Sequence, residues 1–439
     1  MDRPLLEVPV GSTGPALAAT LARALRLALD GSGPAVLPVA TPDGASSLRL
    51  ATPDGASAER LDATSPQRLT TSAGPPATHV PEPVALVVRT SGSTGHPRHV
   101  MLDRAALHAS ARATEQRLHG PGRWVLALPL GHVAGVQVLV RSLVAGTDPV
   151  VVDATGGFDP RRLAVAAAEA ASGDDPAYCS LVPTQLHRIV TAAHGERRLP
   201  AALGPLTRLD AILLGGAAAA PALLDRAREL GLAVVTTYGM TETCGGCVYD
   251  GRPLDGVRLD VDADGVRIAG PVLARGYLGD QPADDAFVTD ADGVRWFRTR
   301  DLGHLHDGVL RLAGRSDDVI ITGGHKVAPA EVEAVLAALP GVGQVCVVGV
   351  PDEEWGAAVT VVVVPGGRGG LPGLTDLRDA VRRTLGSAAA PRHLVLADAL
   401  PERGPGKVDR TEVARRAHAA LHVSPASPNT WTEHHGHTR

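Results

Sequence analysis

The chain has 439 residues, a hydrophobic fraction of 44% and a net charge of −5, which leaves room for a large domain and a smaller one. The negative charge argues against a nucleic-acid partner bound through its phosphates, and no apolar run reaches the roughly 18 residues of a membrane span, so we expect neither a nucleic-acid nor a membrane partner. The first residues lack the pattern of an export signal and the four cysteines form no paired framework, so we expect a cytoplasmic protein; a homodimer is left open.

The N-terminal part of the chain, up to about residue 80, is rich in Ala, Pro, Gly and Ser and contains the heptapeptide ATPDGAS twice, from Ala40 and Ala51. We interpret the duplication as a hairpin or loop expansion. From about residue 81 to 300, short β-like runs alternate with helical stretches, which predicts an α/β domain with mostly parallel sheets. Asp-Gly turns between about 250 and 312 predict a small β subdomain.

The stretch TSGSTGHPRHV, residues 90–100, gathers hydroxyls and glycines between an apolar run and a helical stretch that Asp103 is placed to cap. Backbone N–H groups and hydroxyls of such a loop can approach an anion, so strand, loop and helix together predict a phosphate site. The stretch is not a nucleotide-hydrolase P-loop, because Gly95 is followed by His96 and the chain has no Lys-Ser or Lys-Thr pair. A surface turn rich in Ser and Gly remains the alternative.

A helix is expected to leave the turn PLGHVAG, which contains His132. Its apolar run VQVLVRSLV is interrupted by Arg141. A charge in such a run either extends to solvent or faces a buried anion.

The segment TTYGMTETCGG follows the apolar run LAVV, so its polar residues are expected at the carboxyl end of a strand, where open α/β sheets bind ligands. It offers the ring of Tyr238, the hydroxyl of Thr241 and the carboxylate of Glu242. Magnesium takes oxygen ligands, so Glu242 suits it. Cys244 and Cys247 form a single CxxC, which cannot build a zinc site without a second pair.

After about residue 315, helices and strands alternate in a second, mixed α and β unit. We therefore expect a large N-terminal domain over residues 1–314, a small C-terminal domain over 315–422 and a disordered tail over 423–439, whose histidines leave metal binding open. Only two of the 42 basic residues are lysines, Lys326 and Lys407. Both are candidates for a role that needs a compact ammonium.

In this order, the segments TSGSTGHPRHV, TTYGMTE, RTRDLG, GRSDDVIITGGHKV and GPGKVDR resemble the motifs of the adenylate-forming superfamily of acyl- and aryl-CoA ligases, adenylation domains and luciferases. The resemblance runs from about residue 81 to 420. The segments PLGHVAGVQVLVRSLVAG, SLVPTQLHRIV and GMTETCGG look most like those of the o-succinylbenzoate–CoA ligases of menaquinone biosynthesis. The resemblance to the superfamily implies a mobile C-terminal domain. It also leads us to expect that the part of the chain before the phosphate loop is shorter than is usual in the family.

The resemblance also implies a role for each residue that matches a motif. Thr241 would contact the α-phosphate of ATP, Glu242 would bind Mg²⁺, and Lys407 would be the catalytic lysine of the small domain. The implied ATP site consists of Thr90, Ser91, Gly92, Ser93, Thr94, Gly95, Arg98, Gly215, Gly216, Ala217, Tyr238, Gly239, Asp301 and Arg315.

The acid is expected at His132 and Arg141, and the similar ligases have an arginine at this spacing after the histidine. Coenzyme A is expected at Gly323, Gly324 and Lys326, and the hinge between the domains at Asp317. The chain departs from the family at two positions. Arg98 stands where the family usually has lysine, and Arg300 stands where it often has glycine.

The implied reaction joins a carboxylic acid, expected to be o-succinylbenzoate, to coenzyme A through an acyl-adenylate made from ATP. A different aryl- or acyl-CoA ligase and a stand-alone adenylation enzyme that loads a carrier protein remain alternatives. A nucleotide-binding regulatory module is a third, but it leaves Lys407 without a role.

Overall fold

The computed structural model describes twelve stretches of the chain. These are residues 2–11, 14–40, 49–50, 78–90, 98–154, 156–193, 196–262, 264–279, 284–366, 370–402, 407–422 and 433–434. Nearly all of the two heptapeptides, the loop at 91–97 and most of the expected tail lie outside these ranges.

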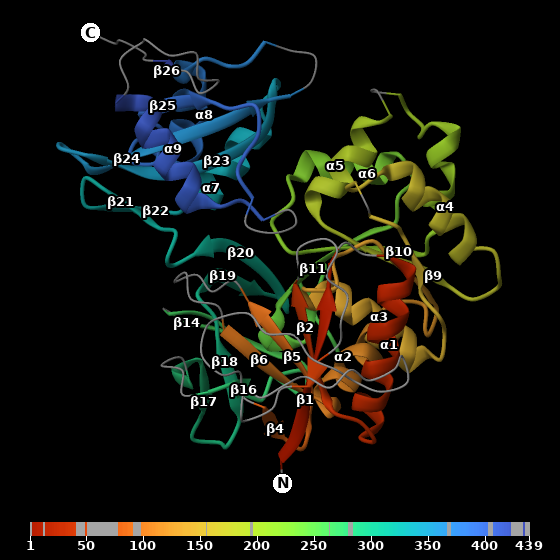
Figure 1. Ribbon diagram of the computed structural model, residues 1–439. Coiled ribbons are helices and arrows are strands. Elements are labelled where there is room, and N and C mark those ends of the chain that lie inside the picture. Colours follow the sequence, from red (N-terminus) through yellow and green to blue (C-terminus); the bar gives the residue numbers. More distant parts are fainter. Residues whose placement is uncertain are drawn as a thin grey trace. The chain divides into compact units, whose positions relative to one another are not determined.

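The chain forms two compact units (Figure 1). Unit 1 comprises residues 1–217, 226–260 and 267–298, and unit 2 comprises residues 218–225, 261–266 and 299–439. The chain from 299 to 314 thus belongs to unit 2, and the division at residue 315 stays a prediction.

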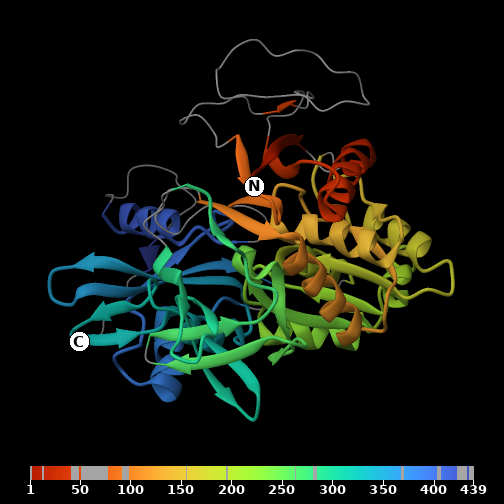
Figure 2. The same cartoon turned by 90° about the horizontal axis from the view of Figure 1, so that it is seen from below.

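The first sheet of unit 1 has seven strands and begins with a parallel β–α–β unit. Helix α1 (Pro15–Asp30) joins its first two strands, starting with a proline at its first turn and ending before Gly31, whose φ of +86° suits glycine. In both views α1, the red helix, lies beside the red strands (Figures 1 and 2). The strands are β1 (Asp2–Val10), β2 (Ala35–Ala40), β3 (Arg49–Leu50), β4 (His79–Pro81), β5 (Val84–Thr90), β6 (Arg98–Asp103) and β16 (Gly276–Tyr277). The described N-terminal residues therefore contribute core strands and a helix.

The second sheet of unit 1 also has seven strands, in the order β13-β12-β11-β10-β9-β7-β8. The run from β8 to β11 is parallel and β12 and β13 are antiparallel, which fits the mostly parallel sheet predicted from the sequence. Its strands are β7 (Arg123–Leu126), β8 (Val150–Val151), β9 (Ala177–Leu181), β10 (Ala211–Leu214), β11 (Val234–Met240), β12 (Gly245–Tyr249) and β13 (Arg252–Pro253). The helices along this stretch are α2 (Arg104–Arg117), α3 (Val133–Ala145), α4 (Pro160–Ala170), α5 (Pro183–Thr191), η1 (Ala201–Arg208), α6 (Pro221–Glu229) and η2 (Thr241–Thr243).

Short antiparallel strands follow, as the Asp-Gly turns predicted. A four-stranded sheet has the order β14-β15-β18-β17, and β19 and β20 form a separate hairpin. The elements are β14 (Arg258–Asp262), β15 (Gly265–Ala269), η3 (Asp284–Ala286), β17 (Phe287–Thr289), β18 (Arg295–Arg298), β19 (Asp301–His306) and β20 (Val309–Arg315).

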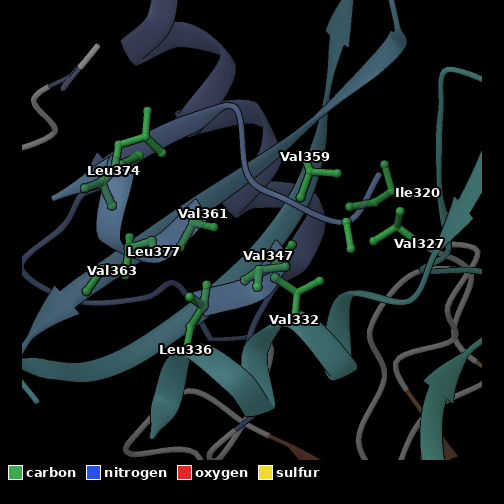
Figure 3. Close-up of a cluster of buried hydrophobic side chains, with 13 residues drawn as sticks. Ile320, Val327, Val332, Leu336, Val347, Val359, Val361, Val363, Leu374 and Leu377 are labelled. Carbon is green, nitrogen blue, oxygen red and sulfur yellow. The ribbon is translucent and has the colours of Figure 1, made fainter. Parts of the chain in front are cut away.

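The remainder of unit 2 is a small α+β fold around a four-stranded sheet, β23-β24-β25-β26. Figure 3 shows Val332 and Leu336 of α7 and Leu377 of α8 gathered with Val347 and Val361 of the sheet in one apolar core. The elements are β21 (Ile320–Thr322), β22 (His325–Val327), α7 (Pro329–Ala337), β23 (Val342–Asp352), β24 (Gly356–Pro365), α8 (Leu374–Leu385), β25 (His393–Leu396), α9 (Arg410–His422) and β26 (Glu433–His434). Among the described helices, none combines the length and the hydropathy needed to cross a bilayer.

Candidate active site

The expected phosphate loop connects the two strands of a β-hairpin. β5 and β6 are antiparallel with Thr90 opposite Arg98, and Thr90 Oγ1 donates to the Arg98 carbonyl at 3.4 Å. A strand therefore follows the loop and α2 begins only after it, which corrects the expected order of strand, loop and helix. The predicted phosphate ligands Ser91, Gly92, Ser93, Thr94 and Gly95 lie outside the described residues.

Asp103 occupies the N-cap position of α2, but its side chain makes no capping hydrogen bond. Its Oδ1 instead accepts from Arg275 Nε at 2.9 Å. The prediction that Asp103 lies at the start of the helix is confirmed, but the prediction that its side chain caps the helix is wrong. Its carboxylate instead forms an ion pair with a residue distant in sequence.

Tyr277 connects the phosphate hairpin to Glu242. Its hydroxyl donates to Glu242 Oε1 at 3.0 Å, and the Arg98 guanidinium carbon lies 5.2 Å from the centre of its ring. Tyr277 reaches this position because β16 pairs with β6, which places it opposite Val100. Burial raises the pKa of Tyr277, with a further contribution from the charge of Glu242, so the phenol stays protonated and acts as the donor.

The turn that carries Thr241 and Glu242 is fixed by its own hydrogen bonds. Thr243 Oγ1 donates to the Gly245 carbonyl at 2.7 Å and accepts from the Met240 N–H at 3.0 Å. The Glu242 carbonyl accepts from the Ala274 N–H at 2.8 Å. The local structure thus holds a carboxylate and a hydroxyl at the end of β11.

The oxygen donors of this turn fit magnesium, which prefers oxygen ligands and commonly takes only one or two carboxylates together with phosphates and water. Among the described residues, no three His, Cys, Asp or Glu side chains gather as a metal cluster. Glu242 is the side chain of this turn that would hold a magnesium ion. Cys244 and Cys247 are free and buried, and burial raises the pKa of Cys247 to about 12.

The predicted adenine residues lie at the ends of two neighbouring parallel strands. Gly215 and Gly216 follow β10, whereas Tyr238 and Gly239 lie on β11, which continues to Met240 because β12 pairs with it. A Cβ on Gly215 would lie 2.4 Å from Thr237 Oγ1, so a larger residue at this position would have to displace the Thr237 side chain. Ala217 follows directly and is exposed.

His132 and Arg141 both lie where the sequence predicted, at the start of α3 and within it. His132 is exposed to solvent, but the surrounding residues partly desolvate its imidazole and lower its pKa. Arg141 is only 4% exposed, so it does not extend to solvent. Its guanidinium carbon lies 4.9 Å from the centre of the Trp124 ring.

Arg141 has no anionic partner among the described residues. Nη2 donates to the Tyr249 hydroxyl at 3.3 Å, and Nε has no hydrogen-bond partner. A buried cation without an acid beside it is costly, so this position is suited to holding an anion.

In unit 2, Asp301, Arg315 and Asp317 form one charged cluster. Asp301 and Arg315 are paired across β19 and β20, and their Oδ1 and Nη1 atoms are 3.3 Å apart. Arg315 also binds Asp317 through two hydrogen bonds of 2.8 Å. Burial would raise the pKa of Asp317, but the paired guanidinium outweighs it and holds the pKa below its usual value. Arg300 is the second position at which the chain departs from the family, and its Nη1 atom lies 3.6 Å from Asp317 Oδ2.

Gly323 and Gly324 form the turn between β21 and β22, with φ angles of +53° and +80°. Lys326 is exposed on β22. Lys407 is also exposed, three residues before the first residue of α9. Both lysines can therefore meet a ligand.

Sequence reasoning missed Tyr277 and Arg410. Tyr277 belongs to the segment ARGYLGD, whose local pattern carries no sign of the link to Glu242, because contacts between residues distant in sequence create it. Arg410 is the last residue of the segment GPGKVDR, and its nearness to Lys407 in the sequence was the signal that could have marked it as a functional residue. Its partners come from distant parts of the chain.

Two family models match the chain. The model described as "AMP-binding enzyme" matches residues 17–278, and "AMP-binding enzyme C-terminal domain" matches residues 331–407. A probable 2-succinylbenzoate–CoA ligase from Mycobacterium tuberculosis is 44% identical over 415 residues, which cover 94% of this chain and 97% of the relative. A 2-succinylbenzoate–CoA ligase from Geobacillus kaustophilus is 34% identical over 361 residues, covering 76% and 69%.

Solved structures are similar as well. A variant of E. coli MenE with one arginine replaced by lysine and with bound OSB-AMS is 28% identical, with a TM-score of 0.67 and coverage of 94% of this chain and 88% of that one. The o-succinylbenzoate CoA synthetase from Bacillus subtilis in complex with the acyl-adenylate intermediate OSB-AMP has a TM-score of 0.67 at 22% identity, covering 93% and 88%. This second likeness shows the fold: an α/β chain with a large N-terminal and a small C-terminal part.

Proposed function

Because the chain belongs to the AMP-binding enzyme family, we propose that it is an acid–thiol ligase that joins o-succinylbenzoate to coenzyme A, with release of AMP and pyrophosphate. The observation that carries the proposal is the 44% identity, over nearly the full length of both chains, with the probable 2-succinylbenzoate–CoA ligase. The reaction places the protein in menaquinone biosynthesis. A cytoplasmic location and a homodimer stay predictions.

The first half-reaction brings two anions together, since the acid carboxylate must attack the α-phosphorus of ATP. Catalysis of such a step depends on positioning and on cations at the phosphates. The loop from Thr90 to Gly95 and Arg98 are assigned to the outer phosphates, Thr241 to the α-phosphate and Asp301 to the ribose. Tyr238 is assigned to the adenine ring.

Magnesium, held by Glu242 and the ATP phosphates, would neutralise phosphate charge when bound. The hydroxyl of Tyr277 supports this role, because it fixes one oxygen of Glu242 and keeps the carboxylate oriented. Lys407 is assigned to the α-phosphate, where its ammonium offsets charge as the acyl-adenylate and pyrophosphate form.

The second half-reaction is the attack of the coenzyme A thiol on the acyl-adenylate, which forms the thioester and releases AMP. Rotation about Asp317 is proposed to remove Lys407 and to bring the Gly323–Gly324 turn to the acyl group. Small residues there leave room for the pantetheine arm, and exposed Lys326 can meet coenzyme A.

The proposed acid carries two carboxylates, of which the succinyl one is activated. Arg141 is the proposed partner of the ring carboxylate, since it is a buried cation whose Nε lacks a partner. His132 lies at the start of α3, the helix that carries Arg141, and its lowered pKa keeps the imidazole neutral near pH 7.

A panel of carboxylic acids tests the proposal through ATP- and coenzyme A-dependent AMP formation. We expect o-succinylbenzoate to give the highest kcat/KM. Preference for another acid would leave a different CoA ligase, and acylation of a carrier protein instead of coenzyme A would indicate a stand-alone adenylation enzyme. Absence of carboxylate-dependent pyrophosphate release with every acid would reject a ligase altogether.

A further inference from the structure

The side chain of Arg410 joins four segments of unit 2. Its Nη1 and Nη2 atoms donate to Glu333 Oε1 and Oε2 of α7, at 2.6 and 2.7 Å. Nη1 also donates to the Val347 carbonyl on β23 at 2.9 Å, and Nε lies 3.3 Å from Asp318 Oδ2. Arg410 itself is the first residue of α9.

This contact set is strong for a side chain near the surface. The Glu333 pair is bidentate, and Glu333 Oε1 accepts in addition from the Val347 N–H at 2.7 Å. Burial alone would lower the pKa of Arg410, but Glu333 outweighs it, so the guanidinium stays charged. The start of α9 is therefore tied to α7, β23 and the residue that follows Asp317.

Lys407 lies three residues before Arg410 on a short extended segment. Val408 forms an isolated bridge with Glu402, and the Asp409 N–H donates to the Pro401 carbonyl at 2.8 Å. These backbone contacts hold the segment to its own preceding chain. Arg410 adds side-chain contacts from this stretch to α7 and to Asp318, whose carboxyl also experiences the charge of Lys407.

We propose that Arg410 is the positioning residue of Lys407: by binding Glu333, Asp318 and the Val347 carbonyl, it sets where the lysine-bearing segment stands relative to the hinge residue Asp317. The inference rests on the proposed role of Lys407 in adenylation. It assigns Arg410 no contact with substrate, so its effect passes entirely through Lys407.

The main test uses Arg410→Lys, which keeps the charge but loses the bidentate fork. We expect kcat of pyrophosphate release to fall roughly 100-fold, as a displacement of about 1 Å can produce, with little change in the KM for ATP. Conversion of supplied acyl-adenylate to thioester should stay within about twofold of the parent enzyme, because that step does not use Lys407. Equal loss in both half-reactions would assign Arg410 a merely structural role.

The matched control is Arg415→Lys. Arg415 lies on the same helix and also makes a bidentate pair, with Glu412, but its side chain is 68% exposed. This variant should leave both half-reactions unchanged. A second variant, Glu333→Gln, removes the charge of the partner and should reproduce the adenylation defect in milder form, which keeps the proposal testable if Arg410→Lys does not fold.

A double-mutant cycle decides whether the effect passes through Lys407. In the Lys407→Ala background, Arg410→Lys should cause no further loss of the residual pyrophosphate release. A further loss as large as in the parent enzyme would overturn the proposal. If Lys407→Ala releases pyrophosphate at the parent rate, the role of Lys407 fails first and the positioning role with it; if Lys407→Ala is inactive but Arg410→Lys is normal, only the positioning role fails.

Discussion

The hydroxyl of Tyr277 donates to Glu242, and its ring lies beneath the guanidinium of Arg98. Phenylalanine at this position would keep the ring under Arg98 and remove only the hydrogen bond to the carboxylate. A hydrogen bond to a charged group contributes about 1.5–3 kcal/mol, so Tyr277→Phe should lower kcat/KM for adenylation by about 10- to 100-fold.

Magnesium titration of this variant shows whether the defect lies in the carboxylate. Tyr277→Phe should need more Mg²⁺ for half-maximal pyrophosphate release, and more Mg²⁺ to promote ATP binding measured by calorimetry. An unchanged magnesium dependence would mean that other contacts orient Glu242.

Arg141 is buried against Trp124 and Tyr249, and its Nε is unpartnered. If it meets the ring carboxylate of the acid, its removal loses a buried ion contact worth about 3–5 kcal/mol. Arg141→Ala should greatly weaken use of o-succinylbenzoate and reduce the preference for it over benzoylpropionate, which lacks the ring carboxylate.

Arg141→Met retains most of the apolar volume and separates this effect from a packing defect. It should show the same loss of discrimination with an ATP affinity close to that of the parent enzyme. If the parent enzyme uses both acids equally, or either variant handles o-succinylbenzoate normally, Arg141 is a core residue and the acid is recognised elsewhere.

At the scale of elements, the β11–β12 pair carries the turn with Thr241 and Glu242. A Cβ on Gly239 would lie 2.1 Å from the Gly245 carbonyl oxygen, which belongs to backbone and cannot rotate away. Gly239→Ala must therefore separate the two strands or distort the turn. Overpacking of this kind typically costs about 1–3 kcal/mol.

We expect Gly239→Ala to lower the urea midpoint of unfolding and to reduce adenylation more than thioester formation. Gly173→Ala serves as the control, because a Cβ at Gly173 meets no atom within 4 Å and should change neither property. A Gly239→Ala enzyme as stable and active as the parent would show that the close contact between the strands is not required.

At the scale of the whole molecule, the proposed reaction needs the part of unit 2 that follows Asp317, which carries Lys407, to serve two half-reactions through rotation at Asp317. Proline fixes φ near −65°, so Asp317→Pro should hold the part of the chain after residue 317 in one orientation. The expected result is near-normal pyrophosphate release with thioester formation lost.

Asp317→Asn controls for the loss of the carboxylate that Arg315 binds, because it leaves the backbone free. It should retain both half-reactions to a greater degree than Asp317→Pro. Thioester formation at the parent rate in Asp317→Pro would place the hinge at another residue.

The sequence alone determined the class of fold, the family and the identity of most proposed site residues. It could do so because strands, helices and ligand-binding turns depend on local patterns: the apolar run before Thr236, the glycines after β10 and the proline at the start of α7 act within a few residues. A local pattern also singles out Arg141, because it is the charged residue within an apolar run.

Only the tertiary structure decided which side chains meet. Two predictions from the sequence were wrong. The order of elements at the phosphate loop depends on the pairing of β5 with β6, and the Asp103 carboxylate binds Arg275 instead of capping α2. The sequence also carried no sign that Tyr277 binds Glu242 or that Arg410 binds Glu333, 35 and 77 positions away. Such contacts depend on how strands and helices pack, and packing brings together residues that no local periodicity relates.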